Sequence, residues 1–132
     1  MSFVLDAHAL MAYFEKEPGY EKVQELLTEA ASSGRLLMLS AVNWGEVFYV
    51  TCREHGKPAA DQIARVIEEF PIEVVPVDIS LAHRAAIYKA THKMSYSDCL
   101  AAALAKMRRA TLVTGDKDFK QVEGDLKIQW LS

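Results

Sequence analysis

The stretch Phe3-Val4-Leu5-Asp6-Ala7-His8-Ala9-Leu10 sets the fold of this chain, because a short apolar run ends in an aspartate and residues of helical composition follow at once. The same succession returns in Thr111-Leu112-Val113-Thr114, which is followed by Gly115 and Asp116. Short apolar, β-branched runs bounded by turn residues predict buried strands. We therefore predict two strands whose carboxyl ends are followed closely by an acid.

Strand-like and helical segments alternate along the rest of the chain. Ser40, Ser95 and Asp78 or Ser80 are suitable N-caps, and small residues such as Gly56 follow the expected helix ends. Strands separated by helices need crossover connections, which predicts an α/β three-layer sandwich with a mostly parallel central sheet, in one domain over residues 1–132. The expected strands are residues 2–6, 36–39, 72–77, 111–114 and 127–131, and the expected helices are 7–15, 20–31, 41–55, 58–70, 79–92 and 96–109.

Composition limits the classes of protein to which this chain can belong. Hydrophobic residues make up 51% of the 132 residues, and the longest apolar runs are far shorter than the roughly 18 residues of a membrane span. No basic segment followed by a cleavable hydrophobic one opens the sequence, so we expect a cytoplasmic protein. Cys52 and Cys99 lie in expected helices without C-x-x-C spacing, which predicts free thiols.

The net charge of −3 argues against a protein that binds nucleic acid through overwhelming positive charge. It does not exclude catalysis on nucleic acid, because cations bound by clustered carboxylates would change the local field. Basic side chains also remain for phosphate contacts, although solvated helix faces are their ordinary location. These residues are Arg53, Lys57, Lys89, Lys93, Arg108, Arg109, Lys117 and Lys120.

Four acids stand at the edge of, or inside, apolar segments where solvated carboxylates are rare: Asp6, Glu46, Asp98 and Asp116. In open parallel sheets ligands bind beyond the carboxyl ends of the strands, where Asp6 and Asp116 are expected. Hard divalent ions such as Mg²⁺ and Mn²⁺ prefer oxygen ligands. The pattern therefore suggests a metal site.

Each acid also has an ordinary structural explanation. Asp6 is placed to cap a helix, and Asp98 stands three residues after Ser95 in the spacing of a capping box. Asp116 and Asp118 lie in a loop whose residues are common turn formers. Glu46 falls on the inward face of its helix, where a buried carboxylate needs a metal, a proton or a salt bridge, the candidate partners being Arg53 and Arg84.

Four short motifs, in order and at fitting intervals, resemble the PIN-domain ribonucleases over essentially the whole chain, and more narrowly the VapC-like toxins of toxin–antitoxin pairs. They are Phe3-Val4-Leu5-Asp6, Ser40-Ala41-Val42-Asn43-Trp44-Gly45-Glu46-Val47, Tyr96-Ser97-Asp98-Cys99-Leu100-Ala101-Ala102-Ala103 and Thr114-Gly115-Asp116-Lys117-Asp118-Phe119. The ending Leu126-Lys127-Ile128-Gln129-Trp130 is also similar.

The resemblance implies a set of functional roles. Asp6, Glu46, Asp98 and Asp116 would bind one or two Mg²⁺ or Mn²⁺ ions, with Asp118 as a further acidic contributor to catalysis and Thr114 ordering the site. The activity implied is an endoribonuclease that hydrolyses RNA by attack of metal-activated water. A cognate antitoxin and a homodimer are implied as well.

His8 departs from the family pattern, which usually has Ser, Thr or Asn two residues after the first aspartate. The imidazole could contact a metal-bound water or a phosphate, ligate Mn²⁺ through nitrogen, or lie on the surface. Because imidazole is a less typical ligand of Mg²⁺ than a carboxylate, we expect no direct metal role for His8.

Two other classes of protein share some of these features with a nuclease. A haloacid-dehalogenase-like phosphatase needs Asp-x-Asp after its first strand, and here the second acid is replaced by His8. A non-catalytic PIN-like module that binds protein or RNA is the remaining alternative, and the intact acidic set argues against it. Trp44, Tyr49 and Tyr96 are expected in the core, so the sequence predicts no stacking platform for bases.

Overall fold

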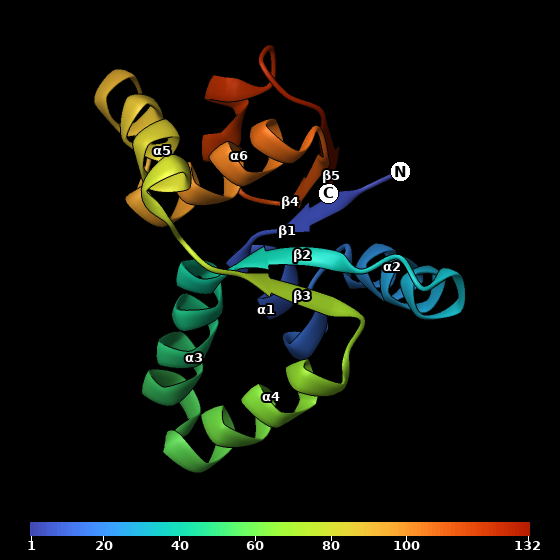
Figure 1. Ribbon diagram of the computed structural model, residues 1–132. Coiled ribbons are helices and arrows are strands. Elements are labelled where there is room, and N and C mark those ends of the chain that lie inside the picture. Colours follow the sequence, from blue (N-terminus) through green and yellow to red (C-terminus); the bar gives the residue numbers. More distant parts are fainter.

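The computed structural model describes residues 1–132 and contains one five-stranded sheet in the order β3-β2-β1-β4-β5 (Figure 1). All four strand pairs are parallel, so the predicted parallel sheet is confirmed and extends to both edges. The strands are β1 (Phe3–Leu5), β2 (Leu37–Ser40), β3 (Ile72–Val75), β4 (Thr111–Thr114) and β5 (Ile128–Trp130).

Helices cover both faces of this sheet, which gives the predicted α/β three-layer sandwich. In Figure 1, α5 and α6 lie on one side of the sheet and α1 to α4 on the other. The helices are α1 (Ala7–Glu15), α2 (Tyr20–Ser33), α3 (Ala41–His55), α4 (Lys57–Glu69), α5 (Ile79–Thr91) and α6 (Tyr96–Arg108), with a 3₁₀ helix, η1 (Lys117–Val122).

Neighbouring residues of the central strands pack into different layers, as the two-residue period of a strand requires. Val4 and Leu112 belong to the core formed with α5, α6 and η1, whereas Leu5 and Val113 belong to the core formed with α1 and α2. All four of these side chains are fully buried. The sheet is thus apolar on both faces, which is the usual condition of a parallel sheet.

The ends of several elements differ from the prediction by one or two residues. Ser40 closes β2 by pairing with Val75, and its hydroxyl also accepts a hydrogen bond from the Asn43 amide to cap α3. β3 stops at Val75 instead of continuing to residue 77, and Asp78, not Ser80, caps α5. The segment expected as a turn after Asp116 continues as η1, because Asp116 caps that short helix.

Gly19 and Gly34 flank α2, and both have the left-handed backbone that favours glycine, with φ of 94° and 74°. A Cβ at Gly34 would meet no atom within 4 Å, whereas one at Gly19 would collide with the backbone of Leu131 and lie 2.7 Å from the Leu131 Cβ. We expect Gly34→Ala to lower the free energy of unfolding by about 1 kcal/mol and Gly19→Ala by about 2 to 4 kcal/mol. Urea denaturation checks both; equal losses would contradict the collision with Leu131.

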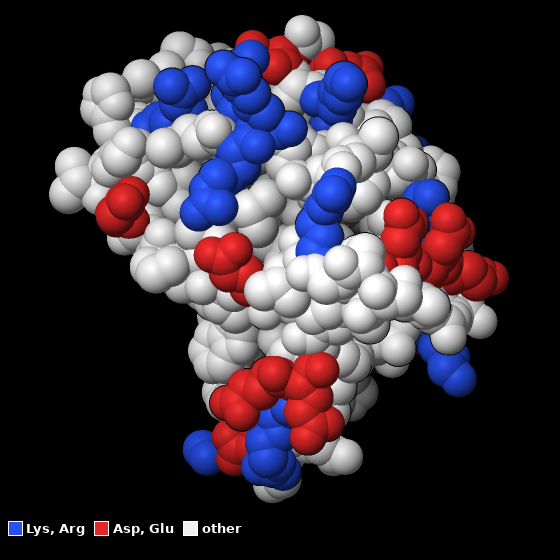
Figure 2. Space-filling model, turned by 45° about the vertical axis from the view of Figure 1, so that its right-hand side comes forward, with Lys and Arg blue, Asp and Glu red and all other residues white.

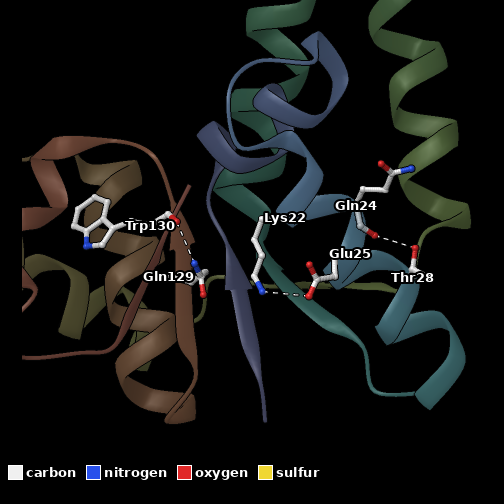
Figure 3. A network of polar contacts seen from close by, with 6 residues as sticks. All are labelled: Lys22, Gln24, Glu25, Thr28, Gln129 and Trp130. Atoms are coloured by element: carbon white, nitrogen blue, oxygen red, sulfur yellow. Dashed lines mark hydrogen bonds and ion pairs between the residues drawn. The ribbon is translucent and has the colours of Figure 1, made fainter. Parts of the chain in front are cut away.

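An open cleft of about 570 Å³ lies between α2 and β5, at the end of the sheet away from Asp6 and Asp116. Its walls include Phe3, Lys22 and Trp130. Figure 3 shows that the polar side chains near it bond within their own elements: Lys22 Nζ lies 3.4 Å from Glu25 Oε1 on α2, and Gln129 Nε2 donates to the Trp130 carbonyl on β5. These side chains therefore do not converge on a ligand position in the cleft.

Cys52 and Cys99 are both free, as predicted; Cys99 is fully buried and Cys52 partly so. None of the helices combines the length and the apolar composition that a membrane span requires.

Candidate metal centre

Asp6 follows β1 directly and is almost completely buried. Its Oδ1 accepts a hydrogen bond of 2.8 Å from the Ala9 amide, which caps α1, and its Oδ2 accepts one of 2.5 Å from the Thr114 hydroxyl. The capping explanation is thus confirmed, but it uses only one carboxylate oxygen. The other oxygen, Oδ2, links β1 to β4. The strand order of the sheet reverses between these two strands, and open parallel sheets bind ligands at such a point.

Thr114, at the end of β4, continues this connection to the next two acids. Its Oγ1 accepts a hydrogen bond of 3.0 Å from the Asp116 amide, and Asp116 Oδ1 accepts one of 2.9 Å from the Asp118 amide. The turn chemistry expected for Asp116 is therefore present. This turn leaves one carboxylate oxygen of Asp116 and both of Asp118 without a hydrogen bond.

Asp98 lies in the first turn of α6, and its carboxylate is close to those of Asp116 and Asp118. Ser95 Oγ accepts a hydrogen bond of 3.2 Å from the Asp98 amide, and the Ser95 side chain also interacts with the Asp98 carboxylate, which lowers the pKa of that group against the larger effect of burial. Carboxylate oxygens of Asp98, Asp116 and Asp118 lie within 4.8 Å of one another. This trio brings together two segments far apart in the sequence.

Glu46 borders the trio from α3. Its Oε1 is buried and has no hydrogen-bond partner, and its carboxylate takes part in no ion pair. The guanidinium of Arg53 lies over the Tyr49 ring instead, 4.9 Å from its centroid, and Arg84 lines a hollow with Tyr88 and Asp125. The salt bridge considered for Glu46 is therefore wrong, because neither candidate arginine forms an ion pair with it.

Burial and like charge together disfavour ionisation at this site. The pKa of Asp6 is raised from 3.8 to about 7, chiefly by burial, with a smaller contribution from the charges of Asp98 and Asp116 and against the opposing hydrogen bonds from Thr114 and Ala9. Burial, followed by the charges of Asp116 and Glu46, raises the pKa of Asp98 to about 6. A set of desolvated carboxylates with an unpaired buried oxygen fits a divalent cation, which would relieve the repulsion.

His8 stands at the surface beside this set. Its imidazole packs on Gly115, where an added Cβ would lie 2.5 Å from His8 Cε1. The ring thus rests on the backbone between Thr114 and Asp116 and is not among the clustered ligand atoms.

If the protein has the metal-dependent RNA cleavage that the sequence resemblance implies, we expect His8→Ser to retain it within about tenfold of the unsubstituted protein, which corresponds to about 1.4 kcal/mol of transition-state stabilisation. The measurement is the initial rate on one RNA at fixed Mn²⁺. A folded His8→Ser protein with no activity would show that the imidazole is essential.

Two of the aromatic residues expected in the core are exposed. Tyr49 and Tyr96 keep 48% and 42% of their surface accessible, and only Trp44 is partly buried, stacked on Phe48. Tyr96 lies two residues before Asp98 at the start of α6. The expectation of core packing was therefore wrong for Tyr49 and Tyr96, and the Tyr96 hydroxyl donates a hydrogen bond of 3.2 Å to the Ala82 carbonyl on α5.

Basic side chains are concentrated despite the net negative charge. Figure 2 shows Lys and Arg gathered over the upper part of the molecule, which in Figure 1 is the layer of α5 and α6, and Asp and Glu gathered mainly on the right and at the bottom. This layer carries Lys106 and Arg108 at the end of α6 and Lys120 in η1.

One buried polar residue near the acids has no role in the sequence prediction. Asn43 is fully buried, and its side chain bridges α3 and α6. Its position three residues after the Ser40 cap and three before Glu46 was visible in the sequence. Its long-range partner, Ser97, was not.

The fold and the site together define a parallel α/β/α sandwich with a carboxylate cluster at the carboxyl end of its central strands. Residues 3–125 match the family model described as the PIN domain, so the chain belongs to the PIN domain family. The resemblance seen in the sequence is thereby confirmed. No curated protein matches this sequence.

Solved structures share the fold over nearly the full chain at low sequence identity. A DNA-bound VapBC from Salmonella typhimurium has a TM-score of 0.78 and 16% identity, with 100% of this chain and 99% of that chain covered. A toxin–antitoxin complex from Klebsiella pneumoniae has a TM-score of 0.74 and 19% identity, with coverage of 99% and 98%. VapC20 from Mycobacterium tuberculosis, a sarcin–ricin loop cleaving toxin, has 0.73 and 19%, with coverage of 92% and 95%.

Proposed function

We propose that this protein is a metal-dependent endoribonuclease and the toxin of a toxin–antitoxin pair. The observation that carries the proposal is the carboxylate trio of Asp98, Asp116 and Asp118, whose oxygens lie within 4.8 Å of one another without a cationic side chain between them. Such a set of charges is unfavourable unless protons or cations neutralise it.

Asp6, Glu46, Asp98 and Asp116 would hold one or two Mg²⁺ or Mn²⁺ ions, and Asp118 would take part from the rim. A bound ion would supply charge neutralisation at the phosphate and a water of lowered pKa. The chain's own contribution is rigidity, because Thr114 fixes one oxygen of Asp6 and the Asp116 backbone through a single hydroxyl. No side chain is needed as a covalent nucleophile.

RNA is the substrate class we favour. The trio is accessible to a polynucleotide, because Asp118 is exposed and Asp98 and Asp116 are half-buried. The basic side chains at the end of α6 lie at the opposite end of that helix from Asp98, so phosphate neutralisation at the trio would come from the bound cation. The side chain of Tyr96, two residues before Asp98, is 42% exposed while its hydroxyl donates to the Ala82 carbonyl on α5, and the proposal includes stacking of an unpaired base on its ring. Cleavage of the sarcin–ricin loop by VapC20, which has the same fold, agrees with this choice.

A partner protein and a second copy of the chain belong to the same proposal. Large apolar residues are exposed at the starts of three helices: Val42 on α3, Ile79 on α5 and Tyr96 on α6. Exposed apolar groups that cluster are typical of interaction surfaces. Structures with the same fold are toxin–antitoxin complexes, which supports an antitoxin partner. A homodimeric toxin that acts in the cytoplasm completes the proposal and rests on the sequence resemblance alone.

The nuclease is tested by incubating the purified protein with total cellular RNA and Mg²⁺ or Mn²⁺, followed by sequencing of the new ends. Samples with EDTA and with folded Asp98→Asn protein are the controls. Cleavage that is lost in both controls supports the proposal and identifies the RNA. No cleavage with any RNA or metal would favour the alternative, a non-catalytic PIN-like binding module.

The antitoxin is tested by gel filtration of the protein alone and mixed with the product of the neighbouring gene. We expect a dimer alone and a larger complex in the mixture, with cleavage suppressed. A mixture that elutes as two separate proteins would count against that partner.

A further inference from the structure

Asn43 is a fully buried polar side chain between two helices that carry acids of the site. Its Oδ1 accepts a hydrogen bond of 2.7 Å from the Ser40 hydroxyl, and its Nδ2 donates one of 3.1 Å to the Ser97 carbonyl. Its own amide donates to Ser40 Oγ at 3.0 Å. Both ends of the side-chain amide are therefore used, one within the first turn of α3 and the other on α6.

This bridge adjoins the acids on both helices. Asn43 precedes Glu46 by three residues on α3, a spacing that places both on the same side of the helix. Ser97 is the residue directly before Asp98 on α6. Because the Glu46 charge raises the pKa of Asp98, these two acids interact, and a bond between the helices near them limits how far repulsion can separate them.

We propose that Asn43 is a positioning residue that sets the separation of Glu46 and Asp98 and thereby the affinity of the site for a divalent cation. This inference rests on the proposed metal-dependent function. Residues that orient metal ligands without touching the metal typically change metal affinity by about 10- to 100-fold when they are removed. A satisfied buried amide is also geometrically specific, because a small displacement leaves its polar atoms unpaired.

If Asn43 only stabilised the fold, its removal would change stability but not Mn²⁺ affinity. Thr51 is the control residue for this comparison. Thr51 lies on the same helix, is equally buried, and donates its side-chain hydrogen bond within α3, to the Val47 carbonyl at 2.8 Å. It makes no bond to α6. Thr51→Ala therefore removes a buried hydroxyl from α3 without releasing the bridge.

The experiment measures the dissociation constant of Mn²⁺ by calorimetry, without RNA, for the unsubstituted protein, Asn43→Ala and Thr51→Ala. The thermal midpoint of each metal-free protein is recorded alongside. We expect both variants to melt earlier, Asn43→Ala to bind Mn²⁺ about 10- to 100-fold more weakly, and Thr51→Ala to bind it within about twofold of the unsubstituted protein. If Asn43→Ala does not fold, Ser40→Ala, which removes the hydroxyl that orients the amide, should weaken Mn²⁺ binding in the same direction.

The possible outcomes distinguish the role of Asn43 from the proposed metal-dependent nuclease activity. Equal Mn²⁺ affinity in Asn43→Ala and Thr51→Ala, with the unsubstituted protein binding Mn²⁺ and cleaving RNA, would overturn the role of Asn43 and leave the nuclease standing. Absence of Mn²⁺ binding to the unsubstituted protein would overturn both.

Discussion

Asp98→Asn is expected to raise the thermal midpoint of the metal-free protein by about 2 to 4 °C while lowering RNA cleavage at least about a hundredfold. The stability gain follows because burial and the charges of Asp116 and Glu46 destabilise the ionised Asp98 carboxylate by more than its hydrogen bond with Ser95 stabilises it. Since the group is partly solvated, we expect a gain of only about 1 kcal/mol. The loss of activity follows from the proposed role of Asp98 as a metal ligand, because such a ligand contributes several kcal/mol to stabilisation of the transition state.

Asp61→Asn is the matched control for this substitution. Asp61 lies on α4, where it accepts a hydrogen bond of 2.8 Å from Lys57 Nζ in an exposed i,i+4 pair. We expect Asp61→Asn to leave cleavage unchanged and to lower stability by no more than about 0.5 kcal/mol. Calorimetry and initial cleavage rates provide the two readouts. A metal-free Asp98→Asn protein that melts earlier than the unsubstituted one would contradict the electrostatic account of the site.

The sequence predicts every strand and α-helix of the fold, with ends correct to within two residues. Periodicity, N-caps and glycines are local signals, so they identify each element without knowledge of its neighbours. The order of the strands depends on which edges pair, and no local signal encodes that pairing. η1 was missed for a similar reason: its residues have turn composition, and only the cap formed by Asp116 marks where it begins.

The acids of the candidate site could be predicted from the sequence, but the residues that hold them in place could not. A charge beside an apolar run is visible in the sequence, so Asp6, Glu46, Asp98 and Asp116 were all identified as candidates. The closeness of Asp118 to the cluster depends on the turn after β4. The role of Asn43 could not be seen because its partner is 54 residues away, and arginine pairing of Glu46 was plausible until the direction of the Arg53 side chain was known.

The metal-free protein is expected to lose stability as the pH rises from about 4 to about 7, a direction opposite to that of most proteins with paired carboxylates. Burial raises the pKa of Asp6 to about 7 and that of Asp98 to about 6, each from 3.8. Between pH 3.8 and these raised pKa values, the folded state holds more protons than the unfolded state, so the free energy of unfolding falls as the pH rises. For fully buried Asp6 the difference is on the order of 4 kcal/mol.

Urea denaturation at a series of pH values, in EDTA, measures this slope. Asp125, whose pKa is lowered by its hydrogen bonds with Tyr88 and Lys106, acts in the opposite sense but only below about pH 4, outside the window. Asp6→Asn should remove most of the slope, because the neutral amide can still cap α1, and Mn²⁺ at pH 7.5 should restore stability to the unsubstituted protein by binding the folded state alone. Stability that rises between pH 5 and 7 in EDTA, or a slope that is undiminished in Asp6→Asn, would contradict the desolvation of Asp6 and would remove the physical reason for a cation at this site.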